Sequence, residues 1–372
     1  MLKIGIITFH DADNYGAVLQ AYALTESIKS LDENAKVEII DYKISSIVSN
    51  YKLFNISHDS SSKMCRTLIS SIIYLPIRFI KKYKFNKFRK KNLTLSKKIY
   101  YKSNDIISYE IYIIGSDQVW NPDITRCDPI FDLEFCDETS LKISYAASIG
   151  KDNLSIEESN YIKKLIEKID IISVRENNAK KIIKQLTNKP ISLVLDPVFL
   201  LDSNEWLKVL AKKKSNERYI LLYMITDKET EEETCKIADL MSKKMKLPVW
   251  YINISYKKEG YGFKHLRNVG PLEFLKLIYN AEFVVASSFH GTAFSIIFKK
   301  NFIATPPKNK SSRLNDLLSL LNLEERLILS RKDIDNNFKQ DINYSVSYKI
   351  LNEEINKSMV FLKDSIRETS KK

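Results

Sequence analysis

The sequence predicts an α/β protein whose two domains face a cleft, and three observations support this class. The chain has 372 residues, which is more than one compact core usually holds. Short apolar runs typical of buried strands alternate with amphipathic runs typical of helices, an order that indicates parallel sheets covered by helices. The alternation pauses near residue 200 and then restarts, so we expect a second α/β domain to begin near residue 205.

Each domain has its own series of predicted elements. In the first domain, residues 1–204, we expect strands at 3–8, 37–42, 111–115, 143–148, 171–174 and 192–195, and helices at 17–31, 156–166 and 178–186. Residues 64–102 interrupt this series as a basic and apolar insertion. In the second domain, residues 205–340, we expect strands at 219–225, 249–254, 283–286 and 302–304, and helices at 229–244, 271–279 and 292–298. Residues 345–367 carry a helical apolar stripe, so the C-terminal part, 341–372, is expected to pack back across the first domain.

Composition excludes several classes of protein. The four cysteines show no paired spacing, which argues against a zinc site or a disulfide framework and indicates a reducing compartment. No stretch reaches the roughly 18 uncharged apolar residues of a membrane-spanning helix. The apolar run at residues 3–8 is too short for a signal peptide. We therefore expect a cytoplasmic protein.

The net charge of +13 is concentrated in one segment. No acidic residue lies between Asp59 and Asp105, whereas thirteen lysines and arginines do. Apolar residues come first, and Tyr83, Phe85 and Phe88 then alternate with lysines. This pattern is typical of a helix on an anionic membrane surface, but a solvated basic face with inward aromatics explains it as well and is preferred. Nucleic acid ranks last, because no nucleic-acid-binding motif accompanies the segment.

The most informative polar cluster is Ser287-Ser288-Phe289-His290-Gly291-Thr292, which follows the predicted strand 283–286. A strand, a turn and a helix over 292–299 would place His290 beside the first free N–H groups of that helix, where an anion is stabilised. An imidazole beside an anion site indicates acid chemistry on a charged substrate. A buried histidine bonded to a backbone carbonyl is the alternative.

A second polar cluster follows the first predicted strand, where ligands of parallel sheets usually bind. Asn14, Tyr15 and Gly16 lie there, just before a helix. Gly16 would let the backbone approach a ligand, whereas Asn14 is also explained as a helix cap. The cluster contains no G-x-G-x-x-G pattern, so a dinucleotide is not expected.

A third cluster, residues 115–122, ends another predicted strand. Its polar side chains suit sugar hydroxyls, and an aromatic ring there suits the face of a sugar. The candidate residues are Ser116, Asp117, Gln118, Trp120 and Asn121. A well-satisfied turn with Trp120 in the core is the alternative.

Two arginines are candidates for binding an anion. Arg175 ends a predicted strand and can bind a carboxylate or phosphate with two hydrogen bonds, although a salt bridge to Glu176 or across the domains explains it too. Arg313 follows Ser311 and Ser312 at the start of a predicted helix, which offers donors as well as charge. An ordinary surface arginine is the alternative for Arg313.

Taken together, five motifs in order resemble the polysaccharide pyruvyl transferase family. They are residues 13–20, 115–120, 173–176, the pair Asp196-Pro197, and residues 287–292. The resemblance covers residues 1–330 approximately. It implies a two-domain fold like that of the GT-B glycosyltransferases and phosphoenolpyruvate as the donor. It also implies transfer of pyruvate to a hexose of a surface polysaccharide or its lipid-linked precursor, with a pyruvate ketal and phosphate as products and with no metal or nucleotide.

The resemblance also implies roles for individual residues. His290 is expected to be the general acid, and Arg175 with the helix start at Gly291 and Thr292 to bind the two anionic groups of the donor. Asp117 is expected to orient or deprotonate an acceptor hydroxyl.

The chain departs from the family pattern at one position. Some members carry an arginine two positions before the histidine, where this chain has Ser288. We expect Arg313 or Lys308 to supply the missing charge.

Two other functions remain open. A nucleotide-sugar-dependent glycosyltransferase would use the same two-domain plan, because a fold alone does not fix the donor. A non-enzymatic scaffold that docks on a membrane through the basic segment would leave the polar strand ends unused. If the acceptor is lipid-linked, the enzyme is expected at the inner face of the plasma membrane.

Overall fold

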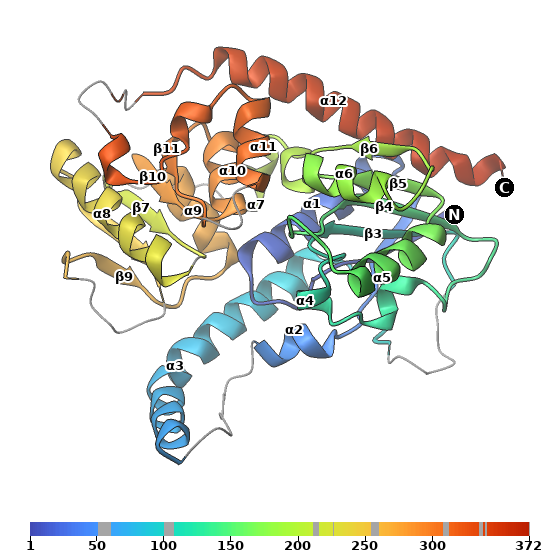
Figure 1. Ribbon diagram of the computed structural model, residues 1–372, viewed down its shortest axis with the longest axis horizontal. Helices are drawn as coiled ribbons and strands as arrows, with labels where there is room; N and C mark the ends of the chain where they lie inside the picture. The colour runs from blue at the N-terminus through green and yellow to red at the C-terminus, as the bar shows by residue number, and fades with distance from the viewer. Residues whose placement is uncertain are drawn as a thin grey trace.

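The computed structural model describes residues 1–50, 61–99, 108–210, 216–225, 227–253, 260–307, 312–334, 338 and 341–371. The chain forms two α/β domains, with a long helix, α3, projecting from the body (Figure 1).

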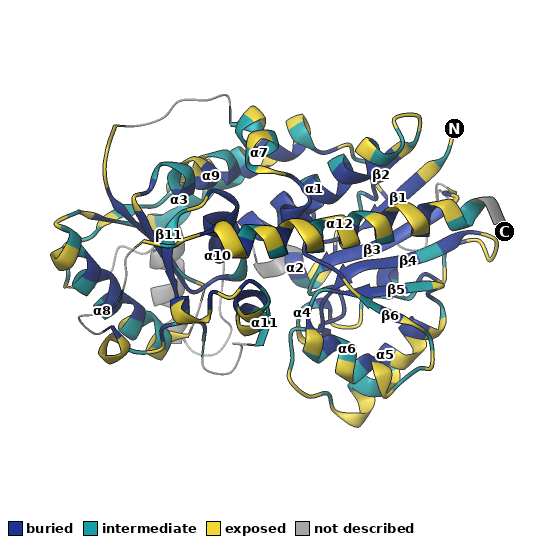
Figure 2. Cartoon of the chain, turned by 90° about the horizontal axis from the view of Figure 1, so that it is seen from above, coloured by how far each residue is buried: buried dark blue, intermediate teal, exposed yellow. Residues whose placement is uncertain are grey.

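The first domain is built on a parallel sheet of six strands in the order β2-β1-β3-β4-β5-β6. The strands are β1 (Lys3–Ile7), β2 (Lys36–Ile39), β3 (Ile111–Asp117), β4 (Leu141–Ala147), β5 (Ile171–Val174) and β6 (Ile191–Leu193). The helices are α1 (Tyr15–Leu31), α2 (Ser45–Asn50), α3 (Ser61–Asn92), α4 (Pro122–Thr125), α5 (Ile156–Glu167), α6 (Asn177–Lys184) and α7 (Ser203–Val209). The central strands are apolar on both faces because helices cover both, and Figure 2 shows them as the most buried part of the domain.

The second domain is built on a parallel sheet of five strands in the order β11-β10-β7-β8-β9. The strands are β7 (Ile220–Tyr223), β8 (Val249–Ile252), β9 (Lys264–Leu266), β10 (Phe283–Ala286) and β11 (Asn301–Ala304). The helices are α8 (Lys228–Met245), α9 (Pro271–Asn280), α10 (Phe289–Ile297) and α11 (Ser312–Leu320).

The C-terminal helix α12 (Ser345–Arg367) links the two domains. At its start, the Tyr348 hydroxyl donates to the backbone carbonyls of Ile296 and Ile297 in the second domain. Further along, the Ser358 hydroxyl accepts from the backbone N–H of Leu195 in the first domain, at 2.9 Å. The helix therefore packs back across the first domain, as its apolar stripe predicts (Figure 1).

The predicted α/β fold class is confirmed, because the described elements form two parallel sheets with covering helices. Two local predictions need correction. The helix expected at 292–298 begins at Phe289, so His290 lies inside its first turn. The edge strand β9 has no counterpart in the prediction, since only three residues pair and they are not fully buried.

Candidate active site

A cavity of about 960 Å³ lies where the carboxyl ends of the two sheets face each other. The segments after β1, β3 and β4 form its first wall. The segments after β7 and β10 and the start of α11 form the opposite wall. Nine predicted site residues line the cavity: Asn14, Gly16, Asp117, Gln118, Asn121, Ser287, Ser288, His290 and Arg313. The fold therefore gathers predicted motifs from both ends of the chain into one site.

Six predicted residues do not line the cavity: Tyr15, Ser116, Trp120, Arg175, Gly291 and Thr292. Trp120 is fully buried in the core of the first domain, so it offers no face to a sugar ring. Tyr15 stacks on Phe274 of the second domain with ring centres 4.4 Å apart, and its hydroxyl donates to the Val269 carbonyl. Both aromatic side chains therefore pack inside the protein and do not face the cavity.

The helix start at Gly291 and Thr292 is not an open anion site. Ser288 caps α10, and its hydroxyl accepts from the Gly291 N–H at 2.9 Å. The Thr292 N–H donates to the Ser288 carbonyl at 3.1 Å. These donors are already satisfied, which corrects the expectation that they bind the donor substrate.

His290 extends from the first turn of α10 to the domain boundary. Its side chain is 12% exposed, and Nε2 lies 3.7 Å from Asp196 Oδ2 of the first domain. Among the described residues, Nε2 has no hydrogen-bond partner, so this nitrogen is not tied to a backbone carbonyl. The imidazole is thus positioned beside a carboxylate and at the cavity wall.

Gly16 permits this position of His290. A Cβ atom built on Gly16 would lie only 1.9 Å from His290 Nδ1, far inside contact distance. The absence of a side chain at residue 16 therefore lets the imidazole of one domain pack against the first turn of α1 in the other. Asn14 caps the same helix by accepting from the Ala17 N–H at 3.3 Å.

Carboxylates enclose the guanidinium of Arg175. Nη1 donates to Asp196 Oδ2 at 2.6 Å, and Nη2 donates to Asp117 Oδ1 at 3.1 Å. The side chain is 1% exposed. Burial would lower the pKa of Arg175, but three surrounding carboxylates outweigh burial and raise it. A salt bridge is thus observed, but its hydrogen-bonded partners are Asp117 and Asp196 of the same domain, and Glu176 lies 3.7 Å away. Arg175 holds Asp117 and Asp196 in place.

Asp196 is the residue that sequence reasoning left without a role. It follows β6, its side chain is fully buried, and it also accepts from the Ser116 hydroxyl at 3.2 Å. Burial would raise the pKa of Asp196, but His290 and Arg175 more than offset burial and hold it well below its usual range. The Asp-Pro motif was visible in the sequence, but only the fold shows that it faces His290.

Asp117 lines the cavity in an unusual backbone conformation. Its φ of 71° lies in the left-handed region, which non-glycine residues rarely adopt. The Asp117 carboxylate also accepts from the Gln118 N–H at 2.9 Å. Gln118 in turn accepts from the Asn121 amide, also at 2.9 Å. Such strain is typical of functional sites. Here the hydrogen-bonded side chains of Asp117, Gln118 and Asn121 line the cavity.

Arg313 places a positive charge at the part of the cavity wall that the structure describes. It lies at the start of α11, lines the cavity, and has no hydrogen-bond or ion-pair partner within the described part of the chain. Burial, followed by the charge of Arg175, lowers the pKa of Arg313, and the nearby carboxylates oppose this. The guanidinium nevertheless stays charged at physiological pH. Lys308, the other candidate, lies outside the described residues.

A second cation at the cavity, Lys151, is already paired. Its Nζ lies 2.6 Å from Glu158 and 3.1 Å from Asp123. Behind it, Glu176 accepts from the Ser148 hydroxyl and fixes the loop after β4. Lys151, Glu158 and Asp123 belong to none of the motifs found in the sequence, whereas Glu176 belongs to the motif 173–176.

The fold and the cavity define a two-domain α/β protein with a cavity between its domains. The chain belongs to the polysaccharide pyruvyl transferase family, whose model matches residues 14–309, well over half of the chain. This is an enzyme family, as the motifs predict. No curated protein sequence matches the chain.

The chain also aligns with solved structures over most of its length, but at low sequence identity. A Staphylococcus aureus MnaA–UDP structure has 11% identity and a TM-score of 0.48, covering 98% of this chain and 91% of that one. The UDP-GlcNAc 2-epimerase of Methanocaldococcus jannaschii has 13% identity and a TM-score of 0.45, covering 95% and 98%. The Escherichia coli heptosyltransferase WaaC has 8% identity and a TM-score of 0.40, covering 82% and 87%.

Within the described residues, none of the helices combines the length and the apolar character needed to cross a bilayer.

Proposed function

We propose that this enzyme transfers pyruvate from phosphoenolpyruvate to two hydroxyl groups of a hexose in a surface polysaccharide or its lipid-linked precursor. The observation that carries this proposal is that Arg313 and His290 both line the cavity from the second domain, opposite a polar wall of the first domain. A cation and a positioned imidazole in one cavity suit an anionic substrate that must be protonated. The cytoplasmic location stays a prediction.

Arg313 binds an anionic group of phosphoenolpyruvate in this proposal. Arg175 cannot do so directly, because Asp117 and Asp196 already occupy its guanidinium. The missing arginine at Ser288 is thereby replaced from α11, a different element of the same domain. Ser287 and Ser288 line the cavity just before His290 in the sequence, and they are further contacts for the donor.

His290 acts as the general acid, and Asp196 positions it. Asp196 faces Nε2 at 3.7 Å and so holds the imidazole at the cavity wall, where the ring delivers a proton to the substrate. Protonation of the methylene carbon makes the central carbon electrophilic, and a sugar hydroxyl attacks it. The bond from that carbon to the phosphate oxygen then breaks, and a second hydroxyl closes the ketal. The two hydroxyl groups lose two protons in total. One proton is matched by the proton added to the methylene carbon, and the other leaves with the phosphate.

The opposite wall holds the acceptor. Asp117, Gln118 and Asn121 present carboxylate and amide groups that suit sugar hydroxyls. Asp117 orients the attacking hydroxyl, because its carboxylate is itself fixed by Arg175 at 3.1 Å.

Thermal unfolding in the presence of candidate donors tests this function. A ligand that binds only the folded state raises the apparent melting temperature by mass action. We expect stabilisation by phosphoenolpyruvate and not by pyruvate, phosphate or nucleotide sugars at equal concentration. Stabilisation by a nucleotide sugar alone would replace the proposal with the glycosyltransferase alternative.

A further inference from the structure

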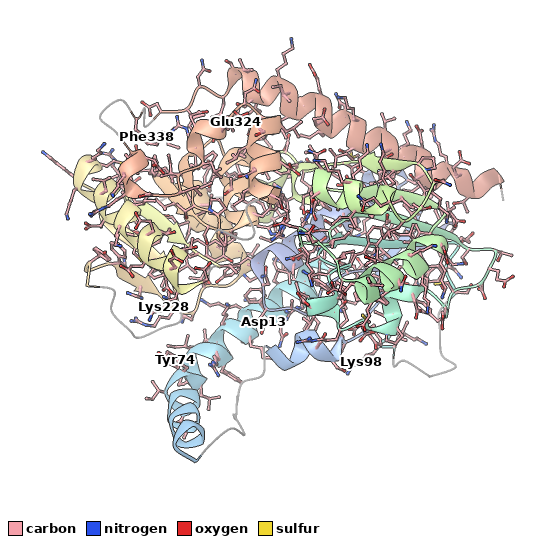
Figure 3. All side chains as sticks on the ribbon, viewed as in Figure 1. Asp13, Tyr74, Lys98, Lys228, Glu324 and Phe338 are labelled. Carbon is pink, nitrogen blue, oxygen red and sulfur yellow. The ribbon has the colours of Figure 1, made fainter. Side chains whose placement is uncertain are left out.

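The distal half of α3 carries the largest group of exposed apolar side chains in the described chain. Ile72, Ile73, Phe79, Ile80 and Tyr83 are between 39% and 61% exposed. This part of the helix projects away from both domains (Figure 1), and Figure 3 labels Tyr74 on the projecting part. Burial within the chain does not explain these residues.

The exposed residues lie on both sides of Pro76, which interrupts the backbone hydrogen bonds of α3. Phe79 and Tyr83 are four positions apart, which places them on one side of the helix. Lys87 and Lys90 continue this face toward the body and are exposed. The exposed apolar residues of α3 at positions 72–83 are thus followed by exposed lysines at positions 87–91, nearer to the domains.

The proximal half of α3 is firmly anchored. Phe85 and Phe88 are buried in the core, which confirms inward packing for two of the three aromatics in the basic segment. Lys84 lies 2.6 Å from Glu273 of the second domain. Arg89 donates to the backbone carbonyls of residues 10–12 and to Asp13 Oδ1. The direction of the projecting half is therefore fixed by contacts with both domains.

We propose that the projecting half of α3 is an interfacial helix that binds an anionic lipid bilayer. The apolar face enters the headgroup boundary, where an amphipathic helix typically inserts about 5–10 Å. Lys87, Lys90 and Lys91 then lie near the anionic headgroups. This binding surface is separate from the cavity and does not depend on the proposed reaction.

Charge favours a lipid surface over a second copy of this chain as the occupant. The segment between Asp59 and Asp105 has no acidic residue, so two such helices packed together would place like charges side by side. An anionic bilayer supplies the opposite charge as well as an apolar layer.

Flotation of the purified full chain with vesicles tests the proposal. We expect co-flotation with phosphatidylcholine vesicles that contain phosphatidylglycerol, loss of binding at high salt, and little binding to phosphatidylcholine alone. The variant I72S/F79S/Y83S should remain at the bottom of the gradient. The variant K87Q/K90Q/K91Q should bind about 100-fold more weakly, because each lysine near an anionic surface contributes about fivefold.

Two matched variants control for general surface effects. I156S/V346S/V360S changes three exposed apolar residues outside α3, and K163Q/K181Q/K184Q removes three exposed lysines from α5 and α6. Both should float like the unmodified protein, and all variants should keep its melting temperature. Failure of the unmodified protein to float at low salt would overturn the proposal. So would a dimer in light scattering that I72S/F79S/Y83S converts to a monomer.

Discussion

His290 owes its position to residues that lie far from it in the sequence. Asp196 faces its Nε2 and Gly16 faces its Nδ1, and both belong to the other domain. An Asp-Pro pair and a glycine after a strand are individually common patterns. Sequence reasoning identified His290 and its partner motifs, but their mutual contacts depend on how two domains are packed.

Arg175 shows a different limit of sequence reasoning. The strand end and the residue type predict an anion-binding arginine, and a salt bridge fits the same pattern. Only the geometry decides, because Asp117 and Asp196 lie within hydrogen-bond distance of its guanidinium. Arg313 has the weaker motif, yet it is the arginine that lines the cavity.

Replacement of Asp196 by asparagine should lower kcat about 10- to 100-fold with little change in the Kd for phosphoenolpyruvate, because the partner of His290 is lost while Arg313 remains. The variant should also lose about 3–5 kcal/mol of stability, since the buried Arg175 loses a charge partner. Steady-state kinetics, binding titration and urea unfolding measure the three effects. An unchanged kcat would rule out the positioning role.

The stability difference between the protein and Asp196→Asn should also depend on pH. The folded-state pKa of Asp196 lies below the unfolded value of about 3.9, so its stabilisation is complete above that value and is lost as pH falls below it. The difference in melting temperature between the two proteins should therefore stay constant from about pH 6 to about pH 4 and begin to converge toward zero only below about pH 4. Asp364→Asn, which changes an exposed residue of α12, should show no such convergence.

Replacement of Gly16 by alanine should reduce kcat about 100-fold or more, the range of a lost general acid, because the new methyl group displaces the imidazole of His290. The helix α1 itself should tolerate alanine well. Gly262→Ala is the control for backbone strain alone, since its φ is 72° and a Cβ there meets no atom within 4 Å, so this variant should lose some stability but keep its kcat. Full activity of Gly16→Ala would show that His290 does not need its present position.

At the scale of elements, most strands and helices follow from periodicity, but their ends do not. The apolar run at 283–286 and the helix after it are predictable, whereas the start of α10 at Phe289 depends on the Ser288 cap. That shift of three residues moves His290 into the helix and closes the expected anion site. Caps act through single hydrogen bonds, which periodicity does not register.

Arg89 anchors the helix α3 to the segment after β1 of the first domain. Replacement of Arg89 by methionine should destabilise the protein by about 2–4 kcal/mol, because several buried carbonyls and Asp13 lose their donor. Thermal or urea unfolding measures the loss, and Lys90→Met, at the neighbouring exposed position, should be nearly neutral. Equal stability of the two variants would show that Arg89 is not a structural clamp.

At the scale of the molecule, the alternation of strands and helices predicts two parallel sheets, and the stripe in residues 345–367 predicts the returning helix α12. The projection of α3 was not predictable, because a basic apolar segment is compatible with burial and with exposure. The cavity follows from topology, since parallel sheets that face each other place their carboxyl ends at one boundary.

The most direct test of the central claim is calorimetric titration of phosphoenolpyruvate into the protein and into Arg313→Ala. We expect binding by the protein and affinity about 10- to 100-fold weaker in Arg313→Ala, the effect of losing a charged hydrogen bond. Arg331→Ala, which changes an exposed arginine of the same domain, should bind like the unmodified protein. Equal affinity of Arg313→Ala and the unmodified protein, or no binding by either, would contradict the account.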